Sequence, residues 1–477
     1  MCIKKPFLLP ALISGVCLIL PCLVSAQTFT TLHSFKLSDG SNPYSALVLS
    51  GNILYGTTVA GGNTGGVNGN GTVFAINTDG SGFTNVYNFT SDGSPYYTNS
   101  DGANPYAGLF VSGNTLYGAT YEGGGSAVGT LFAVNTSGTN FVTLHTFTGG
   151  NDGGGPDAGL ILSGNLLYGT AAYGGTNGYG AVIVVNTNGT AFTNLYSFTN
   201  GPDGAGPAGV LILSGKTLYG TTSGGNSGSG SVFAVNTDGT GFTNLHSFTA
   251  NSGFPLYTNK DGDSPEAGLV LSGSTLYGTA SGGGSSGYGT LFAVSTNGKS
   301  FTTLYTFTNG TDGANPRGGL ILSSNTLYGT AYNGGLGSGT VFAINTNGTG
   351  FTTLHVFALS NVYPYTNGDG AHPEGGLIFS NNTLYGTATA GGTPPPGFTA
   401  NGTIFSISLG PAAPPKLTIV RSGTNAIVSW PSAVTGWTLQ TNKNLATGAW
   451  GNYAGPVVNN TATNSSAGIL FFRLTNL

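Results

Sequence analysis

The sequence has very little charge. Lys, Arg, Asp and Glu together make up 5% of its 477 residues, against about 25% in an ordinary soluble protein. No basic patch or basic run is present, which argues against nucleic acid as a partner and against electrostatic attachment to a membrane. Scarce charge does not predict disorder here, because 39% of the residues are hydrophobic and 11% are aromatic, which is enough for a packed core.

The first 26 residues have the form of a signal peptide. Two lysines precede an apolar stretch from about Pro6 to Leu23, and small residues precede Gln27. Cleavage before Gln27 predicts a secreted protein, whether periplasmic, extracellular or on the cell surface. An uncleaved membrane anchor is the alternative, and the prolines within the stretch argue against it. No later run is long and apolar enough to predict a second membrane segment.

The three cysteines, Cys2, Cys17 and Cys22, all lie in this segment. The mature chain therefore has no cysteine for a disulfide, a thiol nucleophile or a thiolate metal site. The sequence also has no phosphate-binding loop, no Ser-His-Asp arrangement and no metal-ligand cluster. We therefore expect no cofactor and no metal, and we assign no catalytic residue.

What the sequence does have is a repeat. Leu-Tyr-Gly occurs seven times, at intervals of 51 to 62 residues, a period typical of propellers and arrays. Each repeat predicts four strands, as in Ala208–Leu213, Thr217–Thr221, Ser231–Asn236 and Phe242–Phe248, with Asn-Gly or Asp-Gly pairs at the tight turns. The motif tyrosines are Tyr55, Tyr117, Tyr168, Tyr219, Tyr277, Tyr328 and Tyr385.

The ends of the repeat region complement each other. Residues 27–409 open with a predicted fourth strand, Phe29–Phe35, and close with a predicted third strand, Gly402–Ser408. Pairing of these two strands would complete the last blade and remove an open sheet edge. The sequence thus predicts an all-β fold with a closed seven-bladed β-propeller over 27–409. An open solenoid is the alternative.

The repeat consensus resembles a known family. The pattern Gly-Leu-x-Leu-Ser-Gly-Asn-x-Leu-Tyr-Gly-Thr, followed by Gly-Gly, Gly-Thr-Val-Phe-Ala-x-Asn-Thr and Phe-Thr-x-Leu-His-x-Phe, is similar to the GloVer (Gloeo/Verruco) tandem repeat of exported bacterial proteins. The resemblance covers about residues 28–409. Its strand order is also similar to kelch repeats, with Phe in place of the kelch Trp. The resemblance implies export and a propeller-like fold, and no established activity.

The last part of the chain has a different character. Residues 410–415 form a predicted Pro-rich linker, and residues 416–477 contain all three tryptophans and several strand-like runs. This pattern predicts a small C-terminal β-sandwich. It resembles the fibronectin type III-like modules that end many exported bacterial proteins.

Two polar residues recur in the repeats and favour a structural interpretation. His or Tyr occupies one position of the fourth strand in every repeat, and an Asp-Gly-x-x-Pro motif precedes every first strand. We interpret the first as packing or a hydrogen bond between strands and the second as a turn in which Asp caps backbone amides. Calcium binding is the alternative for the aspartates, although one per blade would be too far apart to converge on an ion.

The residue after each motif proline is different, because it varies and is often charged. It includes the only Arg of residues 27–409 and two of the three Glu of the chain. In a kelch-like blade this position would lie at one mouth of the central channel. A hydrated rim without a ligand is the plain alternative. The seven residues are Tyr44, Tyr106, Asp157, Ala208, Glu266, Arg317 and Glu374, and all except Ala208 are candidate ligand-binding residues.

Three enlarged loops between repeats add further candidates. They share Tyr, Thr and Asn, and long loops on a rigid scaffold often carry binding residues. Exposed tyrosines would suit sugar rings or a protein surface; the alternative is that they fold back onto their own loops. The candidate loop residues are Tyr96, Tyr97, Tyr257 and Tyr365.

These observations leave three functional hypotheses open. We expect an exported, monomeric, non-catalytic binding protein whose propeller face recognises a glycan or a protein partner. The first alternative is a carbohydrate-active enzyme, a glycoside hydrolase or polysaccharide lyase, with carboxylates at the channel mouth. The second is a passive structural component of the cell surface. Fold alone does not separate them.

Overall fold

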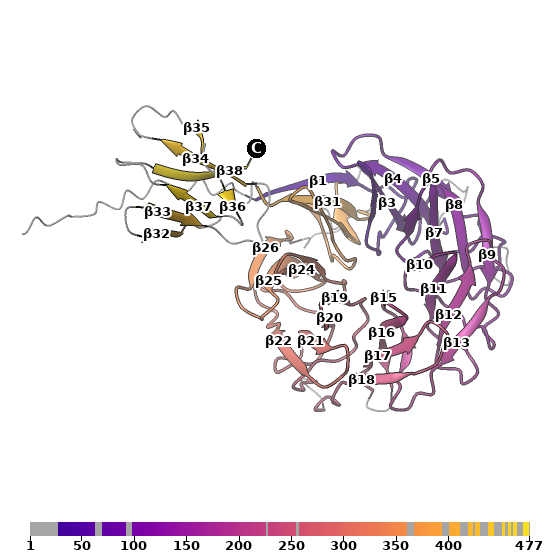
Figure 1. The fold of residues 1–477 in the computed structure, drawn as a ribbon. Helices are drawn as coiled ribbons and strands as arrows, with labels where there is room; N and C mark the ends of the chain where they lie inside the picture. The colour runs from indigo at the N-terminus through magenta and orange to yellow at the C-terminus, as the bar shows by residue number, and fades with distance from the viewer. Residues whose placement is uncertain are drawn as a thin grey trace, which may run out of the picture. The chain divides into compact units, whose positions relative to one another are not determined.

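The computed structural model describes residues 27–62, 69–91, 98–225, 228–253, 257–359, 367–393, 400–410, 418–422, 425–429, 437–442, 451–453, 457–458, 461–464 and 471–476. The predicted signal peptide and residues 411–415 of the predicted linker lie outside these ranges. All regular elements in them are β-strands, in antiparallel sheets arranged around a ring between residues 28 and 408 (Figure 1). The all-β, propeller-like fold is therefore as predicted. None of the described residues forms a helix that is long and apolar enough to cross a bilayer.

Six sheets of the ring are built from strands that follow one another in the chain. The first three consist of β2 (Val48–Ser50), β3 (Ile53–Thr58), β4 (Thr72–Asn77) and β5 (Thr84–Asn88); of β6 (Phe110–Ser112), β7 (Thr115–Thr120), β8 (Thr130–Asn135) and β9 (Val142–Thr146); and of β10 (Ile161–Ser163), β11 (Leu166–Ala171), β12 (Ala181–Asn186) and β13 (Thr193–Ser197).

The next three have the same order. They consist of β15 (Ile212–Ser214), β16 (Thr217–Gly224), β17 (Ser231–Asn236) and β18 (Thr243–Ser247), with the short β14 (Ala205–Pro207) also paired to β16; of β19 (Val270–Ser272), β20 (Thr275–Ala280), β21 (Thr290–Ser295) and β22 (Phe301–Thr306); and of β23 (Ile321–Ser323), β24 (Thr326–Ala331), β25 (Thr340–Asn345) and β26 (Thr352–Val356).

A further sheet joins the two ends of the repeat region. It has the order β1 (Thr28–Ser34), β31 (Thr403–Ser408), β29 (Thr383–Ala388) and β28 (Ile378–Ser380). β1 and β31 pair antiparallel from Thr28 opposite Ser408 to Ser34 opposite Thr403. The N-terminal strand thus supplies the fourth strand of the last repeat, as the sequence predicts.

The first strand of each repeat is shorter than predicted. The sequence predicts a strand over Ala208–Leu213, whereas β15 begins at Ile212. Pro207 lacks a backbone N–H and ends β14, so the chain crosses from one short pairing with β16 to another through residues 208–211. The variable position therefore lies in an irregular segment at the inner end of the sheet.

The Leu-Tyr-Gly motif has a packing reason. Leu218 is completely buried in the core that lies between neighbouring sheets. Gly220 lies two residues further along the same strand, β16, and close to the Phe233 ring. A β-carbon built on Gly220 would be 2.6 Å from Phe233 Cζ and 2.8 Å from Leu211 Cδ2. The motif glycine leaves room for the aromatic ring of the third strand.

Neighbouring sheets are also joined by the repeated His or Tyr of the fourth strand. Each of these rings stacks on a Phe of the next sheet, with ring centroids 3.6–4.1 Å apart and interplanar angles of 4–11°. The last of the series, His355, stacks on Phe29 of β1. The pairs are His33–Phe83, Tyr87–Phe141, His145–Phe192, Tyr196–Phe242, His246–Phe301, Tyr305–Phe351 and His355–Phe29.

The same rings contact the repeated aspartates. The ring nitrogen or hydroxyl lies 2.9–3.4 Å from the Asp of its repeat. Asp203, for example, accepts hydrogen bonds from Tyr196, from the backbone N–H and hydroxyl of Thr199, and from Gly201 N–H. The structural interpretation of both repeated residues is confirmed by these contacts. The contacted aspartates are Asp39, Asp101, Asp152, Asp203, Asp261, Asp312 and Asp369.

The chain divides into two compact units, Gln27–Ser408 and a second that contains Leu409–Leu477. In the second, one sheet has the order β32 (Thr418–Ser422), β33 (Asn425–Ser429), β37 (Thr461–Asn464) and β36 (Val457–Val458). Another has the order β35 (Gly451–Asn452), β34 (Trp437–Asn442) and β38 (Phe471–Asn476). Val428 and Ala462 of the first sheet and Leu439 of the second share one buried cluster.

The packing of the motif glycine leads to a test. Gly220→Ala should destabilise the protein by about 1–3 kcal/mol, because the new methyl group overpacks a filled core. The measurement is the urea midpoint of unfolding. Gly253→Ala is the matched control, since a β-carbon there meets nothing within 4 Å. Equal midpoints for the two variants would contradict the packing account of the motif.

Candidate functional site

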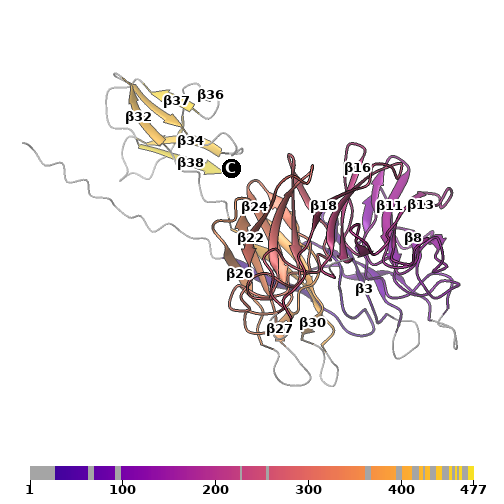
Figure 2. The same ribbon diagram turned by 90° about the horizontal axis from the view of Figure 1, so that it is seen from below.

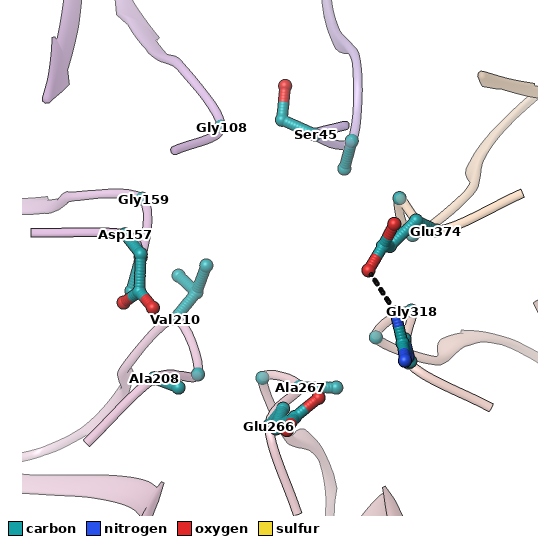
Figure 3. Close-up of a pocket in the computed structure, with 18 of the residues that line it drawn as sticks. Ser45, Gly108, Asp157, Gly159, Ala208, Val210, Glu266, Ala267, Gly318 and Glu374 are labelled. Carbon is teal, nitrogen blue, oxygen red and sulfur yellow. Dashed lines mark hydrogen bonds and ion pairs between the residues drawn. The ribbon is translucent and has the colours of Figure 1, made fainter. Parts of the chain in front are cut away.

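A cavity of about 330 Å³ lies where the inner ends of the sheets meet (Figure 3). We call it the central cavity. Its wall is formed in every repeat by the residues that follow the motif proline, and glycines such as Gly108, Gly159 and Gly318 keep the wall close to the backbone. All seven residues of the variable position line it: Tyr44, Tyr106, Asp157, Ala208, Glu266, Arg317 and Glu374.

Backbone pairing brings two connections of each repeat to this end of the sheet. The segment before the motif proline pairs with the segment after the second strand, as Ala103 does with Glu122 and Gly154 with Tyr173. In the last repeat the pairing is long enough to form strands, β27 (Asn367–Ala371) and β30 (Ala390–Gly392), which lie side by side in Figure 2. The loops on both sides of the first two strands therefore meet at one face.

One side of the central cavity is charged. Arg317 Nη1 lies 3.0 Å from Glu374 Oε1, and the guanidinium carbon lies 4.3 Å above the ring of Tyr332. Burial raises the pKa of Glu374 and of Glu266, while Arg317 opposes both shifts. Arg317 thus holds a position between a carboxylate and an aromatic face, which favours a fixed guanidinium.

Asp157 faces the cavity from the opposite wall (Figure 3). Burial raises its pKa from 3.8 to about 7, and the nearby charge of Glu266 adds to the shift. Asp157 Oδ1, Arg317 Nε and Glu374 Oε2 are buried and have no hydrogen-bond partner in the described part of the chain. Buried polar atoms without a hydrogen-bond partner cost free energy, so these three atoms are candidates to bind a polar group.

Two tyrosines, Tyr44 and Tyr106, line the cavity near Glu374, and two more continue from them beyond the residues that line it. The rings of Tyr44 and Tyr106 meet edge to face at 5.0 Å, Tyr106 meets Tyr121 at 5.6 Å, and Tyr121 meets Tyr173 at 6.3 Å. We call these four residues the tyrosine row. Burial raises the pKa of Tyr44 to about 12, so its phenol stays neutral and can donate a hydrogen bond. Partly buried phenols offer a ligand both an apolar face and a hydroxyl.

Tyr121, Tyr173 and Tyr332 were not among the sequence-predicted site residues. They follow the second strand of their repeats, in a segment that is Val59-Ala60 in one repeat and Ser281-Gly282 in another. The signal that identified the variable position, variation within an otherwise uniform repeat, is present here too. This segment has one charged residue, Glu122, whereas four of the seven residues at the other position are charged.

The structure describes one of the four candidate tyrosines from the enlarged loops. Tyr257 is 54% exposed and is not among the residues that line the central cavity. Its backbone has a positive φ of 44°, which a non-glycine residue adopts at a cost. Tyr96, Tyr97 and Tyr365 lie outside the described residues. The structure therefore brings six of the ten candidates into one cavity.

Because the carboxyl of Asp157 is buried, we expect the Asp157→Asn variant to become more stable relative to wild type as pH rises. The folded protein holds this proton more tightly than the unfolded chain does, so wild type loses stability as pH rises from about 4 through about 7. Asp157→Asn stays neutral, and its stability relative to wild type should increase between pH 4.5 and pH 8. Urea unfolding at both pH values measures this difference.

Asp238→Asn is the control for that experiment. Asp238 is an exposed turn residue whose pKa is lowered from 3.8 by hydrogen bonds from Thr240. Its carboxyl is therefore ionised in both the folded and the unfolded state above pH 4.5, and the stability difference between Asp238→Asn and wild type should stay nearly constant between pH 4.5 and pH 8. Asn188 already makes the same bonds in another repeat. If Asp157→Asn shows no gain at pH 8, the account of Asp157 as an unpaired buried acid is wrong.

Several solved structures resemble the chain at low sequence identity. An oligogalacturonate lyase from Vibrio parahaemolyticus is 11% identical, with a TM-score of 0.48, over 81% of this chain and 98% of that one. The extracellular domain of a putative one-component system from B. thetaiotaomicron is 11% identical, with a TM-score of 0.47, over 93% and 54%. The GH74 enzyme of Niastella koreensis is 15% identical, with a TM-score of 0.46, over 85% and 59%.

No curated protein matches the sequence. The family model that matches is the Gloeobacter/Verrucomicrobia repeat, over residues 93–259 and 254–455. The second match runs past residue 409, where the sequence resemblance was expected to end. Since the two matches together cover well over half of the 477 residues, the chain belongs to the Gloeobacter/Verrucomicrobia repeat family.

Proposed function

We propose that this protein is an exported, non-catalytic binding protein that recognises a glycan in the central cavity. The observation that carries the proposal is the composition of the cavity wall. Tyr44 and Tyr106, the first two residues of the tyrosine row, line it together with Asp157, Glu266, Arg317 and Glu374. Its volume of about 330 Å³ is at the small end of the range for ligand pockets. A flat protein interface would need a much wider surface.

The chemistry of this wall suits a sugar. A pyranose ring has apolar C–H faces, which the phenol rings can cover, and hydroxyl groups, which need partners. Carboxylates accept hydrogen bonds from hydroxyls, Arg317 donates, and a neutral Tyr44 does either. The unpaired atoms Asp157 Oδ1, Arg317 Nε and Glu374 Oε2 would then bind a hydroxyl-rich ligand.

The proposal includes the finer architecture. The sheets of Gln27–Ser408 would be the seven blades of a closed, kelch-like propeller, with the central cavity at one mouth of its channel. Pairing of β1 with β31 and stacking of His355 on Phe29 support closure. The C-terminal unit would be a fibronectin type III-like sandwich, supported by the buried cluster that its two sheets share. Residues 1–26 would direct export and then be removed, leaving a monomer that is periplasmic, extracellular or on the cell surface.

A carbohydrate-active enzyme is the second candidate, and one observation favours it. Asp157, with a pKa of about 7 and Glu266 as a charged neighbour, has the property of a general acid that works near neutral pH. We prefer binding because Glu374, the third carboxylate, is held by Arg317 and the remaining groups are spread around an open ring.

The test is a glycan-array screen of residues 27–477 beside the double variant Glu266→Gln/Glu374→Gln, with every bound glycan examined for cleavage. We expect saturable binding without cleavage that the double variant loses, because both amides remove charged acceptors from the cavity. Asp238→Asn should bind as wild type does, and circular dichroism should show that all the variants are folded.

Three other outcomes of the screen would contradict the proposal. Cleavage that the double variant abolishes would establish the enzyme and overturn the non-catalytic proposal. Binding that survives in the double variant would move the site away from the central cavity. If no glycan binds, a protein partner or a passive role at the cell surface would replace glycan recognition.

A further inference from the structure

The acidic and basic groups of the central cavity are unequal in number. Asp157, Glu266 and Glu374 line it together with a single cation, Arg317. The imbalance extends over the whole repeat region, because residues 27–409 contain five basic and fifteen acidic residues. A cavity with an excess of carboxylates in a region of negative net charge attracts cations.

Arg317 forms an ion pair with only one of the three carboxylates of the cavity. Arg317 is paired with Glu374 at 3.0 Å and lies against Tyr332. It acts on Glu266 only as a nearby charge, which is too weak to cancel the rise in that residue's pKa caused by burial. Asp157, on the far wall, has a buried oxygen without a partner. Two carboxylates of the cavity, Asp157 and Glu266, therefore have no direct cationic partner among the described residues.

We propose that the glycan bound here carries a positively charged amine, and that the ammonium group binds between Asp157 and Glu266. The inference rests on glycan recognition by the central cavity and goes beyond it, because it names the functional group that is recognised. An ammonium has three N–H donors and a full charge, so it can satisfy both carboxylates at once. The sugar ring attached to it would lie against Tyr44 and Tyr106.

A neutral sugar and a metal ion fit these residues less well. A hydroxyl could donate to one carboxylate, but it would leave the like charges of Asp157 and Glu266 near each other without a cation between them. A metal ion would need several converging ligands, and no group of three His, Cys, Asp or Glu side chains within the described ranges is placed to hold one. An ammonium needs no fixed coordination geometry.

The experiment compares two oligosaccharides that differ only in the amine. Isothermal titration calorimetry of residues 27–477 at pH 7 would measure binding of a β-1,4-linked glucosamine tetramer and of its N-acetylated counterpart. The free amine should bind at least about tenfold more tightly, as expected when a charge-assisted hydrogen bond is gained. A higher salt concentration should weaken binding of the glucosamine tetramer more than binding of the acetylated tetramer, because salt screens the charge of the amine.

Two variants locate the effect. Asp157→Asn and Glu266→Gln should each weaken binding of the free-amine tetramer more than binding of the acetylated tetramer, and so reduce the preference for the amine. Asp238→Asn, which lies outside the cavity, should leave both affinities as in wild type. The comparison of the two ligands on wild type does not depend on how well any variant folds.

The inference is overturned if the two tetramers bind wild type equally, or if only neutral glycans bind; in both cases glycan recognition itself stands. It is also overturned if both single variants keep the full preference for the amine. If no glycan of any kind binds, the proposed function fails together with the inference.

Discussion

The structure depends on one repeated contact, the stacking of a His or Tyr of each fourth strand on a Phe of the next sheet. The stacked ring is held in place by the aspartate of its own repeat, which also accepts hydrogen bonds from a backbone amide, as at Asp203 and Thr199. Sheets that are joined in this way all around a ring need no ion pairs between them. The stacking of His355 of β26 on Phe29 of β1 makes the same contact between the sheet that joins the two ends of the repeat region and the sheet before it.

This way of joining sheets explains how a protein with so little charge is held together. Most aspartates of the repeat region are engaged in turns and in ring contacts, and the core between the sheets is apolar. Four further charged residues line the central cavity: Asp157, and Glu266, Arg317 and Glu374 from consecutive repeats. Buried charges that folding does not require lower the stability of the folded state. Such a compromise between stability and another role is common at functional sites.

The cavity has the properties expected of such a compromise. Asp157 is buried without a partner for one oxygen, and its raised pKa means that the ionised form destabilises the folded state. An asparagine or an alanine would remove this cost, and Ala208 shows that a small residue is accommodated at the equivalent position of the next repeat. The unpaired carboxylates and the tyrosine row together favour binding of a polar ligand with an apolar face.

The sequence by itself determined the repeat, its four strands, the pairing of its two ends and the variable position, because local periodicity and turn chemistry act over a few residues. It also separated the repeated His and Asp, which are structural, from the residues that line the cavity. Only the tertiary structure decided that Tyr121 packs against Tyr106 and that Tyr332 packs against Arg317. It also decided that the first strands are shorter than predicted, and that Arg317 pairs with Glu374 and leaves Asp157 Oδ1 without a partner. These contacts join residues that are far apart in the chain, across the meeting point of separate sheets, and no local pattern encodes such distances.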